Sequence, residues 1–388
     1  MNAIVLGNGL SGRAAATLLR REGHAVTVLD DKDAWPNGAW DLCVTSPGVP
    51  LDHPWQAAAH AAGVKVISEL QLGASRWKGR ALAVTGSKGK SSVVKLIADT
   101  LNRSGIPAVP CGNYGTPLCE VVNRNGEGVG FWAVVEVSSF QMETTDDFHP
   151  DAAAILNLQE DHLDRHGSVE AYHDLKRKLL AGARRTVQAD AAWDDCLAGS
   201  YFDNDILRPN GEIAAGLLSV AGLDRTQIAA GFKAFEPLPH RMQLVAEIGG
   251  VRYVDDSKAA ALAALAAGVA MCGGPVRLIA GGLAKGDNPK SVIPRLRSAV
   301  KKVYLIGRCA DQFLSAWREA VPCEACETLD RAVAAARRDA VAGETVLLSP
   351  GAASFDQFES YGVRGDAFAS FVCAEARRGE PDTTKQGR

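Results

Sequence analysis

Residues 83–92 read Ala-Val-Thr-Gly-Ser-Lys-Gly-Lys-Ser-Ser, an apolar segment that runs into a glycine-rich turn. Backbone N–H groups in such a turn, left uncovered by its two glycines and continued into a helix, can surround phosphate oxygens. Lys90 would neutralise those oxygens, and the hydroxyl of Ser91 would face Mg²⁺. The strict Walker spacing fails, because its first glycine falls on Val84. The stretch predicts a strand, a phosphate-binding loop and a helix, with a plain strand-to-helix turn as the alternative.

Length and composition indicate a multidomain enzyme. The chain has 388 residues, more than one hydrophobic core usually organises, so two or three domains are expected. A net charge of −3 with no basic tract argues against a nucleic-acid binder. No apolar stretch reaches the roughly 18 residues of a transmembrane helix, and the N-terminus enters a strand rather than a signal peptide. We therefore expect a cytoplasmic protein that does not insert into membranes.

The nine cysteines are scattered along the chain. Cys323 and Cys326 are the one close pair, and no second pair or group of histidines completes a zinc site with them. Reduced and mostly buried thiols are the expected state.

The first eighty residues form an α/β unit of their own. Residues 3–6 are a short apolar strand, followed by Gly-Asn-Gly-Leu-Ser-Gly at 7–12, a helical stretch, and a second strand at 25–29 that leads to Asp30. This layout is typical of a dinucleotide fold, with a helix N-terminus for a diphosphate and an acid for a ribose or base. By itself it fits a nicotinamide enzyme, a flavoprotein, a sugar-nucleotide binder or a purely structural turn. A second loop at 45–50 also follows a strand-like segment.

Two further groups of polar residues follow strands in the centre of the chain. Residues 131–135 form a strand that leads to Glu136, where a carboxylate can hold Mg²⁺ beside the phosphate loop; a solvated sheet edge is the alternative. Residues 152–158 form the next strand, and Gln-Glu-Asp-His-Leu-Asp-Arg-His follows at 159–166. So many acids and histidines after one strand predict a metal or phosphate site. On pattern alone, Lys176 in the next helix is surface decoration.

The C-terminal part alternates strands with helices, which predicts a doubly wound parallel sheet. Apolar strands are expected at 251–254, 276–280, 303–306 and 345–348. An alanine-rich run from Ala259 predicts a helix that ends near Met271. The small residues at 349–358 form a loop that could let a ligand approach the backbone, and residues 379–388 are expected to be a frayed tail.

Six motifs, in this order, resemble those of one family, the ATP-dependent Mur ligases of peptidoglycan synthesis. They are Thr-Gly-Ser-Lys-Gly-Lys-Ser at 85–91, Glu-Val-Ser-Ser-Phe-Gln at 136–141, Leu-Asn-Leu-Gln-Glu-Asp-His-Leu-Asp-Arg-His at 156–166, Leu-Pro-His-Arg-Met-Gln at 238–243, Asp-Asp-Ser-Lys-Ala at 255–259 and Leu-Leu-Ser-Pro-Gly-Ala-Ala-Ser-Phe-Asp-Gln-Phe at 347–358. The resemblance runs from Ala3 to about Phe371, and the last motif points to the members that add D-glutamate.

The resemblance implies three α/β domains. These are a Rossmann-like UDP-binding domain at 1–79, a central domain with a P-loop-type ATPase sheet at 80–238, and a Rossmann-like, doubly wound C-terminal domain at 239–388. The implied reaction joins D-glutamate to UDP-N-acetylmuramoyl-L-alanine through an acyl phosphate, using ATP and two Mg²⁺ ions. The N-terminal glycine-rich loop would then bind UDP and not NAD. The expected partners are these small molecules, and a monomer is expected.

The resemblance also implies a role for each matching residue. By this resemblance, the residues with catalytic roles are Lys90, Glu136, His162 and Lys176. Magnesium contacts fall on Ser91, Glu136, His162 and a carbamylated Lys176. ATP contacts fall on Thr85, Gly86, Ser87, Lys88, Gly89, Lys90, Ser91, Ser92, Asn210, Arg241, Asp256 and Lys258. Contacts to the UDP precursor fall on Leu10, Ser11, Asp30, Lys32, Ser46 and Asn113. Contacts to the incoming amino acid fall on Lys285, Ser354, Phe355 and Tyr361.

Two departures from the family pattern bear on substrate choice. Ala260 and Ala261 stand where D-glutamate ligases commonly have threonine and asparagine, so a hydroxyl expected to touch the amino acid is missing. The stretch at 190–210 is shorter than usual and lacks a His-Asn segment before Asn210, which predicts a trimmed central sheet and adenine pocket. Ligation of L-glutamate or another amino acid stays open, as does a weakly active homologue that binds the UDP precursor as a regulatory subunit. A nicotinamide oxidoreductase is the alternative from another enzyme class.

Overall fold

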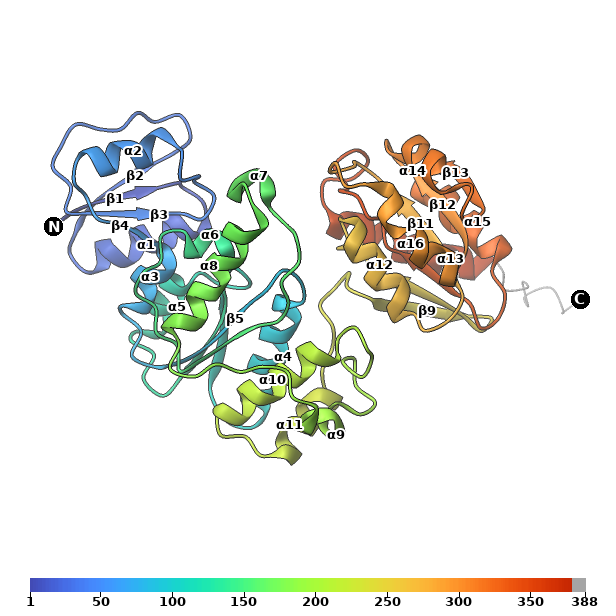
Figure 1. Cartoon of the computed structure of the whole chain (residues 1–388), viewed down its shortest axis with the longest axis horizontal. Helices are drawn as coiled ribbons and strands as arrows, with labels where there is room; N and C mark the ends of the chain where they lie inside the picture. Colours follow the sequence, from blue (N-terminus) through green and yellow to red (C-terminus); the bar gives the residue numbers. More distant parts are fainter. Residues whose placement is uncertain (379–388) are drawn as a thin grey trace, which may run out of the picture. The chain divides into compact units, whose positions relative to one another are not determined.

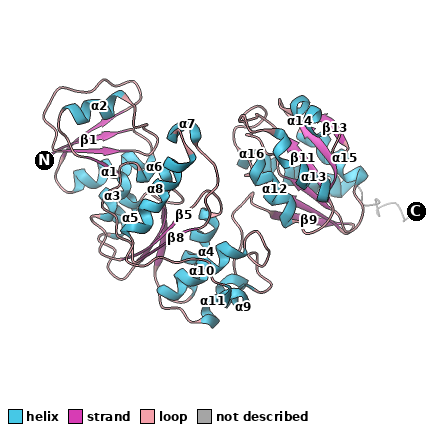
Figure 2. Ribbon diagram, in the orientation of Figure 1, coloured by secondary structure: helices cyan, strands magenta, loops and turns pink. Residues whose placement is uncertain are grey.

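The computed structural model describes residues 1–378, so the tail expected at 379–388 lies outside the described residues. The chain divides into two compact units, with the boundary between Phe235 and Glu236. Figures 1 and 2 show strands flanked by helices in both units, which confirms the α/β class. The first unit holds two sheets and the second holds one. The domain boundary expected at 79/80 therefore lies inside the first unit and stays a prediction.

The N-terminal sheet is wholly parallel, with the strand order β2-β1-β3-β4. Its strands are β1 (Asn2–Leu6), β2 (Ala25–Leu29), β3 (Leu42–Thr45) and β4 (Val66–Ser68). Its helices are α1 (Leu10–Arg21), α2 (Pro54–Ala61) and α3 (Glu69–Ala74). Short apolar strands that are buried on both faces are expected where helices cover a parallel sheet, and Ile4, Val5 and Leu6 are fully buried here.

The turn between β1 and α1 requires glycine at two positions. Gly7 has a φ of +91°, a left-handed value that other residues rarely adopt. A Cβ atom added at Gly12 would lie 1.8 Å from the carbonyl oxygen of Gly7, because α1 passes close to the end of β1. Gly9 in the same loop has no atom within 4 Å of the corresponding position.

We predict that Gly12→Ala lowers the stability of the protein by roughly 3 kcal/mol or more, since the backbone around Gly7 must move. Gly9→Ala is the matched control and should change stability by less than about 1 kcal/mol. Thermal unfolding of both variants checks this. Equal midpoints would show that α1 does not lie against the end of β1 as described.

The central sheet is also parallel, with the order β6-β7-β5-β8. Its strands are β5 (Arg80–Thr85), β6 (Ala108–Gly112), β7 (Trp132–Glu136) and β8 (Ala152–Ile155). The helices of this region are α4 (Lys90–Arg103), α5 (Leu118–Asn125), α6 (Ser139–Met142), α7 (Leu163–His166), α8 (Val169–Gly182), α9 (Asp194–Leu197), α10 (Arg208–Val220) and α11 (Arg225–Lys233), with a 3₁₀ turn at Ala191–Trp193.

Helices cover both faces of the central sheet. On one face, Ile97 of α4, Ile213 of α10 and Phe232 of α11 share a buried core with Leu82 and Val134 of the strands. On the other face, α5, α6 and α8 pack against alternate residues of the same strands. The strand that begins at Ala152 is shorter than expected from sequence, because the chain leaves the ladder after Ile155 to contact the phosphate loop.

The C-terminal sheet has the order β13-β12-β11-β14-β10-β9. Its strands are β9 (Gln243–Ile248), β10 (Val251–Asp255), β11 (Val276–Gly281), β12 (Val300–Ile306), β13 (Cys323–Glu327) and β14 (Thr345–Leu348). Its helices are α12 (Leu262–Met271), α13 (Ile293–Ala299), α14 (Ala310–Trp317), α15 (Leu329–Asp339) and α16 (Tyr361–Arg378), with a 3₁₀ turn at Pro289–Val292. Helices α12, α13 and α14 contribute to one core of this unit, and α15 and α16 contribute to the other.

Two expectations for this unit need correction. The sheet is not purely parallel, because β9 pairs with β10 in an antiparallel hairpin. Its turn is Gly249-Gly250, with φ values of +60° and +74°, and such a pair between two apolar runs is a hairpin signal. The alanine-rich helix begins at Leu262 and not at Ala259. Ala261 is extended, with φ −139° and ψ 151°, since the chain before it turns back toward β10.

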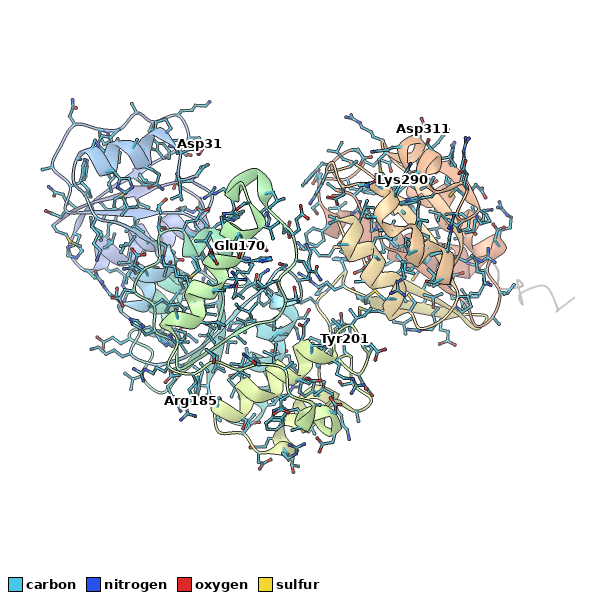
Figure 3. All side chains as sticks on the ribbon, viewed as in Figure 1. Asp31, Glu170, Arg185, Tyr201, Lys290 and Asp311 are labelled. Carbon is cyan, nitrogen blue, oxygen red and sulfur yellow. The ribbon has the colours of Figure 1, made fainter. Side chains whose placement is uncertain are left out.

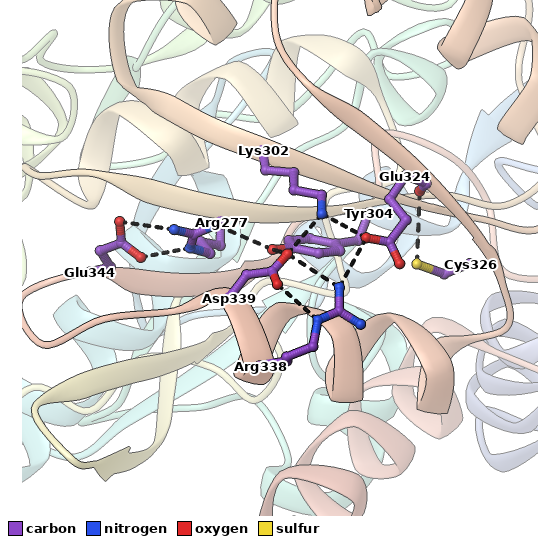
Figure 4. Close-up of polar contacts among 8 residues, drawn as sticks. All are labelled: Arg277, Lys302, Tyr304, Glu324, Cys326, Arg338, Asp339 and Glu344. Atoms are coloured by element: carbon purple, nitrogen blue, oxygen red, sulfur yellow. Dashed lines mark hydrogen bonds and ion pairs between the residues drawn. The ribbon is translucent and has the colours of Figure 1, made fainter.

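A charged network lies near the amino ends of the C-terminal strands (Figure 4). Lys302 of β12 contacts Glu324 at 2.6 Å and Asp339 at 2.7 Å, and the hydroxyl of Tyr304 donates to Asp339 at 3.0 Å. The hydrogen bond from Lys302 holds the pKa of Asp339 below its usual range. All of these charges have partners, and the network lies at the edge of the sheet away from the loops described below, so we assign it to stability.

In the part of the chain that the structure describes, no helix is long and apolar enough to cross a membrane. The cysteines are free thiols, and Cys323 and Cys326 both lie on the edge strand β13.

Candidate active site

The polar motifs of the central sheet all follow the carboxyl ends of its strands. The phosphate loop follows β5, Asn113 follows β6, Glu136 ends β7, and Asn157 follows β8. In a parallel sheet these ends lie at one edge, which is where such sheets bind ligands. The sheet therefore brings together motifs that are up to seventy residues apart in sequence.

The phosphate loop is fixed by the segment after β8. The backbone N–H of Ser87 donates to the carbonyl of Asn157 at 3.0 Å. The side chain of Asn157 accepts from the N–H of Lys88 at 2.9 Å and donates to its carbonyl at 3.0 Å. Gly86 and Gly89 have φ values of +145° and +86°, so this loop conformation favours glycine at both positions. The shape of the loop is thus set by these hydrogen bonds and by its two glycines.

Two lysines converge on one carbonyl oxygen of this loop. The ammonium groups of Lys90 and Lys176 donate to the carbonyl of Gly86 at 2.8 and 3.1 Å. Lys176 is only 1% exposed, so the reading of it as surface decoration is wrong. Burial, together with the nearby charge of Lys90, lowers the pKa of Lys176 to about 7. The nitrogen of Lys176 also lies 4.3 Å from the ring centre of Tyr172, whose hydroxyl contacts Ser87.

Glu136 offers an oxygen that could bind a cation. Its side chain is 2% exposed, and Oε1 accepts from the amide of Asn113 at 2.7 Å. Oε2 is buried without a hydrogen-bond partner, as is the hydroxyl of Thr85 at the end of β5. Buried oxygens without partners are rare and are the kind of ligand that Mg²⁺ prefers. These residues therefore fit a magnesium ion.

His162 lies at the start of α7 in a left-handed conformation, with φ +54°. Its side chain is 47% exposed, and its ring centre lies 4.9 Å from Phe140 and 6.1 Å from Tyr172. Among the described residues, no three His, Cys, Asp or Glu side chains are grouped to hold a metal. A metal at this edge would therefore also need oxygen ligands from a substrate, from water or from a modified lysine.

The remaining residues of the predicted ATP site divide between the two units. Ser91 and Ser92 lie in the first turn of α4. Asn210 is 6% exposed in α10, and a Cβ at Gly89 would come within 2.5 Å of its side-chain nitrogen, so it lies against the phosphate loop. Arg241, Asp256 and Lys258 belong to the second unit.

The residues predicted to bind UDP lie at the carboxyl edge of the N-terminal sheet. Leu10 and Ser11 begin α1, and Leu10 is 71% exposed. Asp30 and Lys32 follow β2, where Figure 3 labels the neighbouring Asp31. Ser46 follows β3, and its hydroxyl donates to the carbonyl of Gly7 at 3.3 Å. The amide of Asn8 contacts Asp30 at 3.4 Å, so the loops after β1, β2 and β3 are connected.

In the second unit, the predicted residues follow three neighbouring strands, β11, β14 and β10. Lys285 is exposed after β11, while Ser354 is buried and Phe355 is exposed after β14. Leu283 and Ala353 exchange two backbone hydrogen bonds of 2.9 Å, which pair these two loops. The nitrogen of Lys258, after β10, lies 3.7 Å from the ring centre of Tyr361. The sheet thus gathers the predicted amino-acid residues at one edge.

Arg364 of α16 was not expected from the sequence. It is 1% exposed and donates to the hydroxyl and carbonyl of Ser257 at 3.0 and 2.9 Å, and to the carbonyl of Ala352 at 3.2 Å. Burial lowers its pKa to about 10. It joins the loops after β10 and β14, and no local pattern marks a buried arginine of this kind. The sequence assigns no role to Asn157 or Tyr172, although Asn157 lies inside a quoted motif and Tyr172 lies in the same helix as Lys176.

Asp256 is a buried carboxyl at this edge. It is 8% exposed, and it accepts hydrogen bonds from the hydroxyl of Ser349 at 2.9 Å and the N–H of Met242 at 3.4 Å. Burial outweighs these bonds and raises its pKa to about 7. The folded state is therefore increasingly disfavoured as the pH rises from the ordinary value of 3.8 to about 7.

We predict that Asp256→Asn stabilises the protein more at pH 8 than at pH 5, by roughly 2 kcal/mol, because the amide avoids the cost of a buried charge. Thermal unfolding at the two pH values checks this, with the exposed Asp311→Asn as the control that should show no such difference. The same gain for Asp256→Asn at both pH values would contradict the raised pKa.

Comparison with known proteins places this geometry in a family. Residues 84–199 match the Mur ligase middle domain, and residues 240–351 match the Mur ligase, glutamate ligase domain. A relative from Acidobacterium capsulatum, named UDP-N-acetylmuramoylalanine–D-glutamate ligase, is 33% identical over 443 residues, covering 96% of this chain and 96% of the relative. The chain belongs to the Mur ligase family. The alignment is longer than the 388 residues of this Mur ligase, so the relative has segments that are absent here.

Solved structures share the fold. The UDP-N-acetylmuramate-alanine ligase MurC from Thermotoga maritima superposes with a TM-score of 0.59 at 15% identity, covering 98% of this Mur ligase and 100% of that chain. The MurF ligase from the same organism, solved in complex with ADP, has a TM-score of 0.59 at 13% identity and covers 88% and 96%.

Proposed function

We propose that this Mur ligase adds D-glutamate to UDP-N-acetylmuramoyl-L-alanine in the cytoplasm, using ATP, as the name of its Acidobacterium relative suggests. The observation that carries the proposal is the convergence of Lys90 and Lys176 on the Gly86 carbonyl, next to the strand that carries the unpartnered oxygen of Glu136. Lys90 at the start of α4 and Lys176 in α8 place positive charge beside a glycine-rich loop, which creates a site for a polyanion. The ADP bound to the MurF neighbour supports a nucleotide as that polyanion.

The reaction needs an activated carboxylate, because a carboxylate and an amine do not condense at neutral pH. An oxygen of the alanyl carboxylate attacks the γ-phosphorus of ATP, and the bond to ADP breaks. The glutamate amine then attacks the acyl carbon, loses a proton, and phosphate leaves. Lys90 offsets the charge of two approaching anions in the first step and of the departing phosphate in the second.

Magnesium would be held by Ser91, Glu136, His162 and a carbamylated Lys176, with two ions in all. When bound, it would supply positive charge to the phosphate oxygens of the nucleotide. Lys176 can be carbamylated only as the neutral amine, which burial favours near pH 7. The carbamate would add a negative charge and two oxygen ligands at a place where two ammonium groups otherwise repel.

The substrates would occupy three edges of sheets. UDP would bind at the N-terminal sheet through Leu10, Ser11, Asp30, Lys32 and Ser46, with no role for NAD, and Asn113 would meet the muramoyl part. ATP would bind the loop at 85–92 and Asn210, with Arg241, Asp256 and Lys258 from the C-terminal region. Glutamate would contact Lys285, Ser354, Phe355 and Tyr361. We expect a monomer with domains at 1–79, 80–238 and 239–388.

Ligation of L-glutamate is the second candidate function, and the residues before α12 are the observation that supports it. Ala260 and Ala261 bring no hydroxyl or amide to this edge. The N–H of Leu262 donates instead to the carboxylate of Asp287 at 3.2 Å, in the loop that also carries Lys285. The polar groups facing an amino acid therefore differ from the family pattern.

The test is phosphate release by the purified protein with ATP, Mg²⁺ and UDP-N-acetylmuramoyl-L-alanine. We expect release that requires D-glutamate, with a rate at least about 100-fold lower in Lys90→Ala, because one charge on the phosphates is lost. Lys176→Ala at low bicarbonate should also be impaired. Lys95→Ala is the control for removing a lysine from the same helix, because Lys95 pairs with Asp99 of α4 and not with the phosphate loop.

Phosphate release that is faster with L-glutamate than with D-glutamate would support the second candidate function instead. Absence of release with any amino acid, from folded protein that still binds the precursor, would contradict the ligase and favour a regulatory homologue. Full activity of Lys176→Ala at low bicarbonate would show that the reaction does not need a carbamylated Lys176.

A further inference from the structure

Arg165 makes a buried set of contacts that the proposed reaction does not use. Its guanidinium donates to both carboxylate oxygens of Glu143, at 3.0 and 2.5 Å, and lies 4.8 Å from the ring centre of Phe140. It also donates to the carbonyls of Pro47 at 3.3 Å and Val49 at 3.1 Å. The Arg165 and Glu143 side chains are only 14% and 5% exposed. We call these contacts the Arg165 clamp.

The carboxylate side of the clamp holds the two metal motifs together. Glu143 follows α6, which begins three residues after Glu136. Arg165 lies in α7, and its N–H donates to the carbonyl of His162 at 3.1 Å. His166 adds contacts to Glu143 at 3.4 Å and to the hydroxyl of Ser139 at 3.0 Å. The clamp thus fixes the segments of Glu136 and His162 relative to each other.

The other side of the clamp reaches the N-terminal sheet. Pro47 and Val49 belong to the loop after β3, and Val49 turns back onto the carbonyl of Ser46 with a bond of 3.0 Å. Ser46 in turn contacts Gly7. The loop at 46–50 is therefore tied both to the predicted UDP loop and, through Arg165, to the central sheet.

Packing alone does not fix this loop. A hollow of about 960 Å³ lies beside the clamp. It is lined by Pro50, Leu51, Phe140, Glu143, Arg165 and His166, among others. Val49 packs against the core of the N-terminal sheet, and beside the open hollow the loop is held by the planar guanidinium, which can bond a carboxylate and two carbonyls at once.

We propose that Arg165 is a positioning residue that holds the 46–50 loop in register with the His162 and Glu136 segments. The inference rests on the proposed function, in which the clamp aligns the UDP precursor so that the carboxylate of the precursor meets the phosphate loop. Arg165 does not contact the phosphate loop in this structure and reaches the nucleotide only through the Glu136 and His162 segments, so its loss should affect the precursor more than the nucleotide.

The test compares Arg165→Met, Arg165→Lys and Glu143→Gln with wild type. Calorimetry measures binding of UDP-N-acetylmuramoyl-L-alanine and, separately, of a non-hydrolysable ATP analogue with Mg²⁺. We expect Arg165→Met to weaken precursor binding about tenfold or more and to raise its KM, because the 46–50 loop loses its two hydrogen bonds to the guanidinium. Arg165→Lys should be intermediate, and in every variant the analogue should lose less affinity than the precursor.

Arg177→Met is the matched control, because Arg177 is also an ion-paired arginine, with Glu170 and Asp174 as its partners, but is exposed on α8. It should leave both affinities unchanged. The positioning role of Arg165 is refuted if folded Arg165→Met keeps the precursor affinity and KM of wild type. An equal loss of affinity for the precursor and the analogue also refutes it. If Arg165→Met does not fold, the affinities of Arg165→Lys and Glu143→Gln for the precursor and the analogue are compared in the same way. Wild type that binds neither compound would refute the proposed function instead.

Discussion

The convergence of two lysines on the Gly86 carbonyl is the interaction on which the site depends. Two ammonium groups held this close repel, and burial lowers the pKa of Lys176 to about 7. Lys90 approaches this carbonyl from the start of α4 and Lys176 approaches it from α8, while Asn157 braces the loop. Binding of anions stabilises such an arrangement. The phosphate chain of a nucleotide, together with a carbamate on Lys176, would supply the negative charge.

All three sheets of the described residues place polar loops where ligands could bind. Each sheet places its polar loops at the carboxyl edge, so that a diphosphate, a triphosphate and an amino acid could each find backbone N–H groups and a few charged side chains there. In the N-terminal sheet this edge depends on the close approach of α1 at Gly12. In the C-terminal sheet it depends on Arg364, which joins the loops after β10 and β14. The Arg165 clamp connects the first two edges within one compact unit.

Local patterns in the sequence predicted much of this architecture. The run at 83–92 has the apolar residues and glycines of a strand, loop and helix, and β5 and α4 lie there. Glu136 could be identified because a carboxylate that ends a buried strand is recognisable from its neighbours. Lys176 could not, since its burial depends on how α8 packs against a loop ninety residues earlier, and only the family resemblance marked it. The partners of Arg165 in the 46–50 loop are backbone carbonyls, which carry no signature in the sequence. The hairpin at Gly249-Gly250 did carry a signal, and the regular alternation around it concealed it.

The central claim is that the loop at 85–92 serves to activate a carboxylate by phosphorylation. The most direct measurement uses UDP-N-acetylmuramoyl-L-alanine with ¹⁸O in its alanyl carboxylate, followed by mass spectrometry of the phosphate released in the presence of D-glutamate. If an acyl phosphate forms, each phosphate carries one labelled oxygen from the precursor. Phosphate released at the same rate without label would contradict the account, because the carboxylate would never have been bonded to phosphorus.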